Sequence, residues 1–183
     1  SARRSAIPTS APNGTTPYDM VVGDVDGDDN LDVIMSVTNF SSGLLALALG
    51  NGDGTFADPI TSQAVPNPGY LKLGKWGGTA DVQLAVTGAS STIHVVDVNP
   101  EGFDDLTPAG VGWKNNNWRV NAIEAADVDE DGQSELYIAM DNSYVDGEGI
   151  QRLTDLTSPT PSNTWVAGVN FGVLRMAFAD IDG

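Results

Sequence analysis

Short apolar runs alternate with acidic, glycine-containing loops along this chain, and the clearest example lies at residues 120–141. An apolar approach through Ile123 leads into a loop of closely spaced acidic residues, and a second apolar run occupies residues 136–140. Short apolar runs bounded by Gly and Asp are typical of β-strands. The pattern therefore predicts a strand–loop–strand unit.

This unit recurs through the chain. A second complete copy occupies residues 23–35. A degenerate copy, which keeps the apolar residues but not the acidic ones, occupies residues 73–86, and the beginning of a further copy occupies residues 177–183. The first loop position falls at residues 24, 75, 127 and 180, so successive copies are 51, 52 and 53 residues apart. A nearly constant period of this kind indicates a repeat architecture.

Each period has room for four short strands. Strands are predicted at residues 20–22, 33–37 and 44–49, at 71–73, 84–87 and 92–98, and at 173–179, where a fourth repeat opens. The nearly continuous apolar character of residues 44–49 predicts a strand that is buried on both faces. Four strands per period, joined by Gly, Asn and Asp turns, predict an all-β fold of β-propeller blades, each a four-stranded antiparallel sheet. Three blades and the first strand of a fourth are expected.

Acidic residues at loop positions 1, 3, 5 and 9 predict calcium sites. Their oxygens can surround one hard cation, a glycine supplies the tight bend, and the backbone carbonyl of position 7 can complete the shell. The predicted ligands are Asp24, Asp26, Asp28, Asn30 and Asp32 in the first loop, Asp127, Asp129, Asp131, Gln133 and Glu135 in the third, and Asp180 and Asp182 in an incomplete fourth. An EF-hand is excluded because it needs a carboxylate at position 12 on a helix. Here position 12 is Met35 or Ile138, each within a strand-like run.

The first two loops depart from this pattern in different ways. The second has Lys75, Gly77 and Thr79 at positions 1, 3 and 5, so no calcium is expected there. Packing of Trp76 and hydrogen bonds must hold that loop instead. The first loop has its glycine at position 4 rather than 6, which leaves Asp29 in the bend. Asp tolerates the left-handed conformation better than most residues, so the loop is expected to close.

Charge and composition exclude several classes of partner and indicate the location of the protein. With 25 acidic and 8 basic residues the formal net charge is −17, which makes nucleic acid and anionic membranes poor partners. The absence of Cys excludes a disulfide framework, and no apolar run approaches the ~20 residues of a transmembrane helix. Calcium loops of micromolar to millimolar affinity fill outside cells, so an extracellular location is expected.

The amino-terminal segment and several side chains carry further expectations. Residues 1–17 are rich in Ser, Pro, Thr and Ala and are predicted to form an extended tail or linker. Asn13 and Asn39 each open a possible N-glycosylation sequon. Trp113, which precedes three consecutive Asn residues, could stack on a sugar or wedge between blades. His94, the only histidine, alternates with apolar residues in a strand and is expected to be structural.

Residues 50–56 form a Gly-rich turn, Gly-Asn-Gly-Asp-Gly-Thr-Phe. With this turn, the loop spacing and the period, the chain resembles the FG-GAP/VCBS repeat family. That family includes the integrin α-type propeller and several propeller lectins. The resemblance covers about residues 18–183. It implies a seven-bladed propeller with calcium loops between the first two strands of a blade, and a role in adhesion, ligand binding or as an accessory domain. On this basis the blades cover about residues 18–69, 70–117 and 118–170, with a partial blade at 171–183.

Three functions remain open. The first is an extracellular, calcium-stabilised structural or adhesive module that binds a protein or glycan ligand at the cell surface. The second is a lectin that binds glycans in grooves between blades or at Trp113, and the third is an accessory propeller of a secreted polysaccharide-degrading enzyme. The sequence contains no Ser/His/Asp set, no phosphate loop and no paired-carboxylate motif outside the calcium loops, so catalysis is not expected.

Closure of the ring sets a final expectation. Propellers close with roughly four to eight blades, whereas three blades and one strand form an arc that leaves an apolar face bare at each end. We therefore expect either an excerpt of a longer protein or a subunit completed by copies of itself, as a homo-oligomer or filament.

Overall fold

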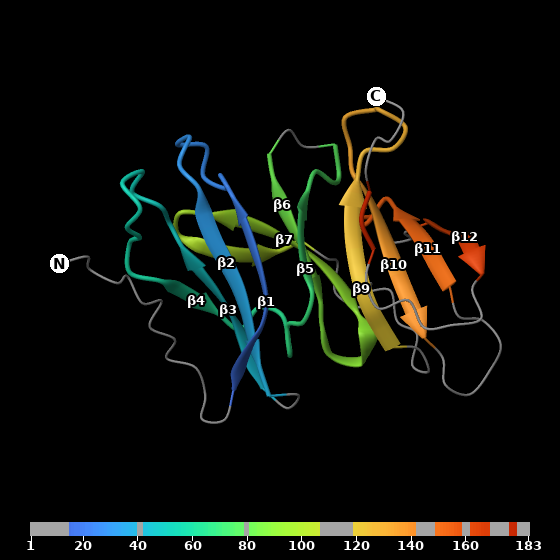
Figure 1. The fold of residues 1–183 in the computed structure, drawn as a ribbon, viewed down its shortest axis with the longest axis horizontal. Coiled ribbons are helices and arrows are strands. Elements are labelled where there is room, and N and C mark those ends of the chain that lie inside the picture. The colour runs from blue at the N-terminus through green and yellow to red at the C-terminus, as the bar shows by residue number, and fades with distance from the viewer. Residues whose placement is uncertain are drawn as a thin grey trace.

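The computed structural model describes residues 15–39, 42–78, 81–106, 119–141, 149–158, 162–168 and 176–178. Within these ranges the strands form three four-stranded antiparallel sheets, and the all-β prediction is confirmed (Figure 1). In each sheet every strand pairs with the next one along the chain. The prediction of four strands per period therefore also holds for these three sheets.

We number the sheets in chain order. Sheet 1 contains β1 (Thr16–Gly23), β2 (Asp32–Thr38), β3 (Gly43–Ala48) and β4 (Ile60–Ser62). Sheet 2 contains β5 (Leu71–Gly74), β6 (Gln83–Thr87), β7 (Ile93–Asn99) and β8 (Gly102–Asp105), with the 3-10 turn η1 (Ala89–Ser91) between β6 and β7. Sheet 3 contains β9 (Arg119–Ala126), β10 (Glu135–Asp141), β11 (Gly149–Thr154) and β12 (Ser162–Gly168).

Two predicted boundaries differ from the structure. Strand β1 begins at Thr16, inside the predicted tail, and Pro17 pairs with Val37 of β2. Proline is tolerated here because β1 is an edge strand of sheet 1, where a missing N–H need not break a ladder. Of the strand predicted at residues 173–179, only residues 176–178 are described, and they have no strand geometry. Instead, the Phe178 ring lies against Tyr137 of β10, with the ring centroids 4.5 Å apart.

Sheet 2 lies between the other two sheets and is buried on both faces (Figure 1). Because side chains alternate across a strand, Leu84 and Val86 of β6 pack toward sheet 1, and Ala85 packs toward sheet 3. Their neighbours include Ile34, Leu45 and Leu47 from sheet 1 and Leu136, Ile138 and Met140 from sheet 3. Burying one such large aliphatic side chain contributes about 1.5–3 kcal/mol. These two layers of side chains hold the sheets together.

Strand β3 is buried along its whole length, as the apolar run at residues 44–49 predicted. One of its faces joins the core against sheet 2. The other face, through Leu44 and Ala46, forms a small cluster with Val37 of β2. A strand with one face in solvent alternates apolar and polar residues, whereas the continuous apolar run of β3 is typical of a strand that is buried on both faces.

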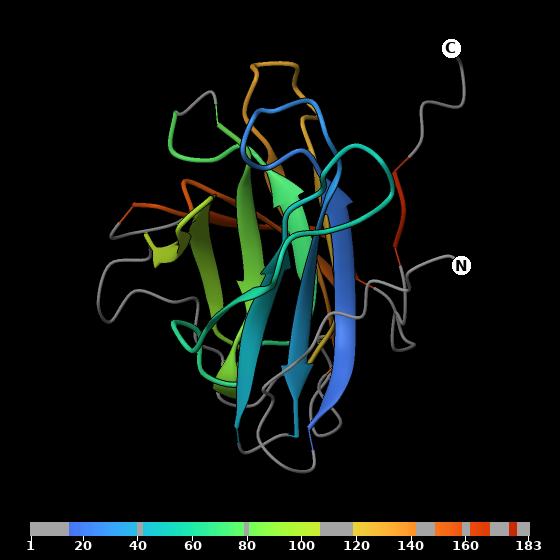
Figure 2. The ribbon, with the colours of Figure 1, turned by 90° about the vertical axis from the view of Figure 1, so that its left-hand side faces the viewer.

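The first strands of the three sheets lie next to one another. Strand β5 contacts β1 on one side and β9 on the other. The backbone N–H of Leu71 donates to Asp19 Oδ2 at 2.9 Å, and Lys72 forms an ion pair with Glu124 at 3.0 Å. The loops that follow β1, β5 and β9 consequently project from the same end of the molecule (Figures 1 and 2).

Candidate metal centre

We call the segments at residues 24–32, 75–83 and 127–135 the first, second and third loop. Two of these loops gather carboxylates. Each member of the following groups offers an oxygen within 4.8 Å of the others: Asp24, Asp26 and Asp28 in the first loop, and Asp127, Asp129 and Asp131 in the third. Two oxygens that bind one calcium ion at about 2.4 Å can lie at most about 4.8 Å apart. Both groups therefore fit the donor spacing that one calcium ion requires.

The backbones of these two loops bend at the same positions. Positions 4 and 6 are left-handed in both, with φ of 78° at Gly27, 67° at Asp29, 60° at Glu130 and 88° at Gly132. The predicted left-handed conformation of Asp29 is confirmed. The first loop has glycine at position 4 and Asp at position 6, whereas the third loop has Glu at position 4 and glycine at position 6. A left-handed backbone costs glycine less conformational energy than it costs an acidic residue.

Hydrogen bonds orient the first aspartate of each loop. Asp24 accepts the N–H of Gly27 at 2.8 Å and that of Asp29 at 3.0 Å. Asp127 accepts the N–H of Asp131 at 3.1 Å, and its other oxygen accepts a second N–H at 2.9 Å. A carboxylate has about four lone-pair sites, so each aspartate retains acceptor capacity for an ion after making these bonds.

The carboxylates of the first loop repel one another. Partial desolvation, followed by the charges of Asp28, Asp32 and Asp24, raises the pKa of Asp26, although the N–H of Asp28 opposes this shift. The pKa of Asp28 is lowered because the side chain and the backbone N–H of Asn30 both donate to it, each at 2.8 Å. A dication at the centre of the group would relieve the repulsion.

The residue at position 9 has a structural role in both loops. Asp32 is only 1% exposed, and its two oxygens accept the N–H of Val25 at 2.9 Å and that of Gly50 at 2.8 Å. Glu135 is 4% exposed and accepts the N–H of Val128 at 2.9 Å. Sequence analysis predicted Asp32 and Glu135 as metal ligands. The structure shows that each is the acceptor that closes its loop, and neither belongs to the group of three carboxylates. Metal binding by these two residues stays a prediction.

The second loop, which has no such group, closes in the same way. Gln83 occupies position 9, is 1% exposed, and accepts the N–H of Trp76 at 3.1 Å. Trp76 is 2% exposed and packs in the core between sheets 2 and 3. In all three loops the side chain at position 9 therefore accepts the N–H of position 2. We call this interaction the position-9 latch (Asp32, Gln83 and Glu135).

The second and third loops are joined directly. The N–H of Ser134 donates to the carbonyl of Lys75 at 2.7 Å, and the N–H of Lys75 donates to Ser134 Oγ at 3.0 Å. The side chain of Gln133, whose backbone carbonyl was the predicted ligand, accepts the N–H of Gly78 at 2.9 Å. A groove of about 510 Å³ between the loops is lined by Lys75 together with Asp24 and Asp127.

The Gly-rich turn of the first repeat packs on the first loop. A Cβ at Gly50 would collide with the carbonyl of Leu31, and one at Gly52 would collide with the side-chain oxygen of Asn30. Gly50 also donates its N–H to the latch residue Asp32. The glycines of this motif thus let the turn approach the backbone of the loop closely.

The remaining predicted site residues lie elsewhere. Asn39 is at the end of β2, where its Oδ1 accepts the N–H of Ser42 at 2.9 Å. Asn13, Trp113, Asp180 and Asp182 lie outside the described residues. For these five positions glycosylation, sugar stacking and metal binding remain predictions.

His94 makes contacts that resemble those of a catalytic triad. Its Nδ1 lies 2.9 Å from Asp105 Oδ2, and its Nε2 lies 3.0 Å from Thr92 Oγ1. The Thr92 hydroxyl, however, donates to the carbonyl of Ala89 at 3.0 Å. That bond uses the hydroxyl proton of Thr92, and the roles of the two His94 ring nitrogens depend on the tautomer of the imidazole. The arrangement supports the turn η1.

Comparison with protein-family models, with curated protein sequences and with solved structures finds no match for this chain. Within the part of the chain that the structure describes, no helix has the length and apolar character needed to cross a membrane.

Proposed function

We propose that this chain is a calcium-binding module built from β-propeller blades, in which ions in the first and third loops stabilise the blades. The observation that carries the proposal is the pair of three-aspartate groups, each with oxygens within 4.8 Å of one another. Three carboxylates at this spacing on one loop repel one another in the absence of a cation. The resemblance to FG-GAP/VCBS repeats and the period of 51–53 residues agree with this assignment.

Calcium suits these groups better than magnesium. Calcium takes six to eight oxygens in flexible geometry, whereas magnesium demands near-ideal octahedral geometry and retains its water. Asp24, Asp26 and Asp28 would hold the ion in the first loop, with the carbonyl of Asn30 at position 7. The corresponding set in the third loop is Asp127, Asp129 and Asp131, with the carbonyl of Gln133. When bound, the ion neutralises charge and ties the first strand of the blade to the second.

The module acts outside cells as a structural or adhesive protein, where calcium is abundant enough to fill loops of this kind. Its net charge of −17 disfavours nucleic acid as a partner. We propose that the blades continue around a ring, in a longer protein or through copies of the chain. Met20 and Val22 on one side of β1 are 54% and 49% exposed, and a neighbouring blade would cover them.

Thermal unfolding in calcium and in EDTA tests this function. An ion that binds only the folded state stabilises it by about 2.7 kcal/mol per site at a hundredfold excess over Kd. For a domain of this size each kcal/mol shifts Tm by about 2–4 °C, so two sites predict a clearly higher Tm in calcium. Magnesium at the same concentration should shift Tm less. Identical melting curves in calcium and in EDTA would refute the proposal.

A further inference from the structure

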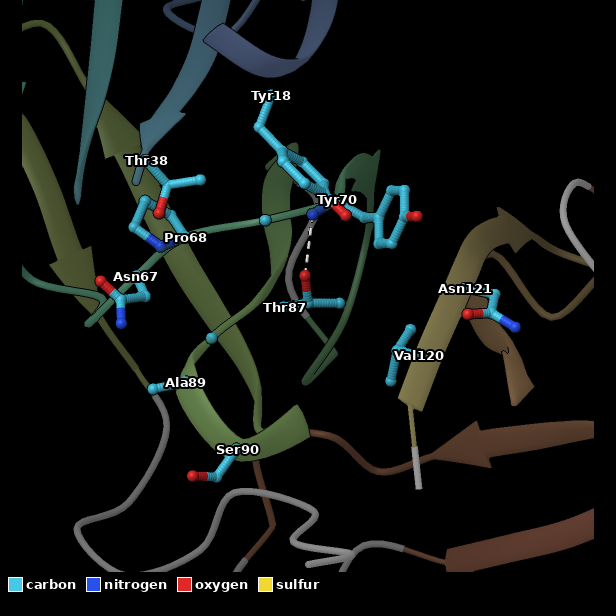
Figure 3. Close-up of a pocket in the computed structure, with 12 residues that line it drawn as sticks. Tyr18, Thr38, Asn67, Pro68, Tyr70, Thr87, Ala89, Ser90, Val120 and Asn121 are labelled. Atoms are coloured by element: carbon cyan, nitrogen blue, oxygen red, sulfur yellow. Dashed lines mark hydrogen bonds between the residues drawn. The ribbon is translucent and has the colours of Figure 1, made fainter. Parts of the chain in front are cut away.

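A second candidate site lies where the three sheets meet, at the end opposite to the loops. It is a pocket of about 720 Å³ (Figure 3), within the ~300–1,000 Å³ range typical of small-molecule sites. Tyr18 near the start of β1, Tyr70 just before β5 and Val120 near the start of β9 contribute to its wall. Because the metal-binding loops follow the far ends of β1 and β9, the pocket and the carboxylates do not overlap.

Hydrogen bonds between and within the sheets fix the pocket wall. The N–H of Tyr70 donates to Thr87 Oγ1 at 2.7 Å, as the dashed line in Figure 3 shows, and the N–H of Gly69 donates to the Thr87 carbonyl at 2.7 Å. From sheet 1, Ser36 Oγ donates to the carbonyl of Gly69 at 2.7 Å. A wall that is already ordered lowers the entropic cost of binding a ligand.

Two aromatic rings form part of the lining. The rings of Tyr18 and Tyr70 pack edge to face, with centroids 5.2 Å apart and planes at 73°. Tyr18 remains 44% exposed, so its ring offers free apolar surface. Burial of its hydroxyl, followed by a hydrogen bond with Tyr70, raises the pKa of Tyr18. The phenol is therefore neutral at physiological pH.

The rest of the lining is uncharged and combines polar side chains with the apolar Pro68, Ala89 and Val120. The lining contains Asn67, Ser90, Asn121 and two threonines but no Asp, Glu, Lys, Arg or His, in a chain with 25 acidic and 8 basic residues. Asn67 and Ser90 have left-handed backbones, with φ of 49° and 58°. Strained residues of this kind occur often at ligand sites. The side-chain amide of Asn121 makes no hydrogen bond within the described part of the chain, so it is available to a ligand.

From this lining we infer that the pocket binds a neutral saccharide. Apolar C–H faces of a sugar ring can stack on Tyr18, while its hydroxyls exchange hydrogen bonds with amide and hydroxyl groups. An anionic ligand would meet a chain of net charge −17, and a cationic ligand would find no carboxylate in the lining. The inference rests on the proposed role as a binding module but does not depend on calcium.

An array of neutral glycans, with sialylated and sulfated counterparts, tests this inference. The wild-type chain should bind neutral members and discriminate against the acidic ones. The best neutral glycan is then titrated calorimetrically into the wild type and into Tyr18→Ala, which should bind at least about fivefold more weakly because an aromatic contact of about 1 kcal/mol is lost. Trp165→Ala is the matched control, because it removes a ring of similar exposure, 49%, from β12 outside the pocket.

Three results would overturn the inference: no neutral glycan bound by the wild type, equal affinity in Tyr18→Ala, or binding of acidic glycans or peptides alone. The thermal melt of Tyr18→Ala verifies that the variant is folded. Calcium uptake measured on the same samples separates the two proposals. Uptake without glycan binding refutes only the saccharide site, and glycan binding without calcium uptake refutes only the calcium function.

Discussion

The second loop and the third loop have the same latch and opposite chemistry. In the third loop, Glu135 accepts the N–H of position 2, and three aspartates lie within 4.8 Å of one another. In the second loop, Gln83 makes the same bond, Lys75 occupies position 1, and no group of metal-ligating side chains is found within its described part. The neutral amide of Gln83 thus closes the second loop in the same way as the carboxylate of Glu135 closes the third.

This comparison separates two tasks that the acidic motif combines. Position 9 closes the loop through a buried hydrogen bond, and its charge is not needed for that purpose. Positions 1, 3 and 5 carry the charge that a cation would neutralise. The second repeat keeps the hydrogen bond of position 9 but has Lys75, Gly77 and Thr79 at positions 1, 3 and 5, and its sheet packs between the other two. We therefore expect no metal in its loop. The following predictions test that separation, from the largest expected effect to the smallest.

The largest effect is expected from Trp76, the buried side chain of the second loop. Trp76→Ala removes a ring that is 2% exposed, and truncation of a buried Trp costs about 3–5 kcal/mol. Urea unfolding should show this loss equally in calcium and in EDTA. Trp165→Ala, at 49% exposure, should cost far less. A loss that appears only in calcium would mean that Trp76 acts through the metal loops.

Removing one charge from the first loop should affect only the calcium-bound state. Asp26→Asn is expected to lose about 2.7 kcal/mol of stabilisation at a hundredfold excess of calcium over Kd. In EDTA the same variant should be as stable as the wild type or slightly more stable, because it removes the repulsion between Asp26 and the neighbouring carboxylates of Asp24, Asp28 and Asp32. Comparable destabilisation in both conditions would show that Asp26 is structural.

The latch predicts the reverse behaviour in the third loop. In EDTA, Glu135→Ala leaves the N–H of Val128 without its acceptor, which costs about 1–3 kcal/mol for a buried group. Glu135→Gln should cost little, because Gln83 makes the same bond in the second loop. Asp129→Ala, on the same loop but outside the latch, is the control and should be nearly neutral in EDTA. Equal stability of all three variants would contradict the latch.

The fold was largely predictable because its evidence repeats. The acidic loops recur at a nearly constant interval, and the apolar runs on either side of them became β1 and β2, then β9 and β10. The left-handed Asp29 could also be anticipated, since the glycine of the first loop is displaced by two positions.

The latch was not anticipated, because Asp at position 9 satisfies a metal motif and a hydrogen bond equally well in a sequence. The one sequence signal for the latch was Gln83, which keeps a side-chain oxygen acceptor at position 9 of a loop without acidic residues at positions 1, 3 and 5. The pocket at Tyr18 could not be predicted either. It brings together residues from three repeats, and local periodicity carries no information about their spacing.

The smallest effect is expected at the junction of the second and third loops. Ser134→Ala removes the acceptor of the Lys75 N–H, a bond of 3.0 Å at the surface. An exposed group can turn to water instead, so the loss should be at most about 0.5–1.5 kcal/mol. Chemical denaturation measures it, with calcium stoichiometry unchanged. A loss of a calcium site in this variant would show that the second loop contributes to metal binding.

Calorimetric titration of calcium tests the central claim most directly. The wild-type chain should take up two ions, Asp26→Asn and Asp129→Asn one each, and the double variant none, because each group of three aspartates forms one site. Lys75→Ala should leave the number at two. No uptake by the wild type, a third ion assigned to the second loop, or unchanged uptake in the two single variants would contradict the account.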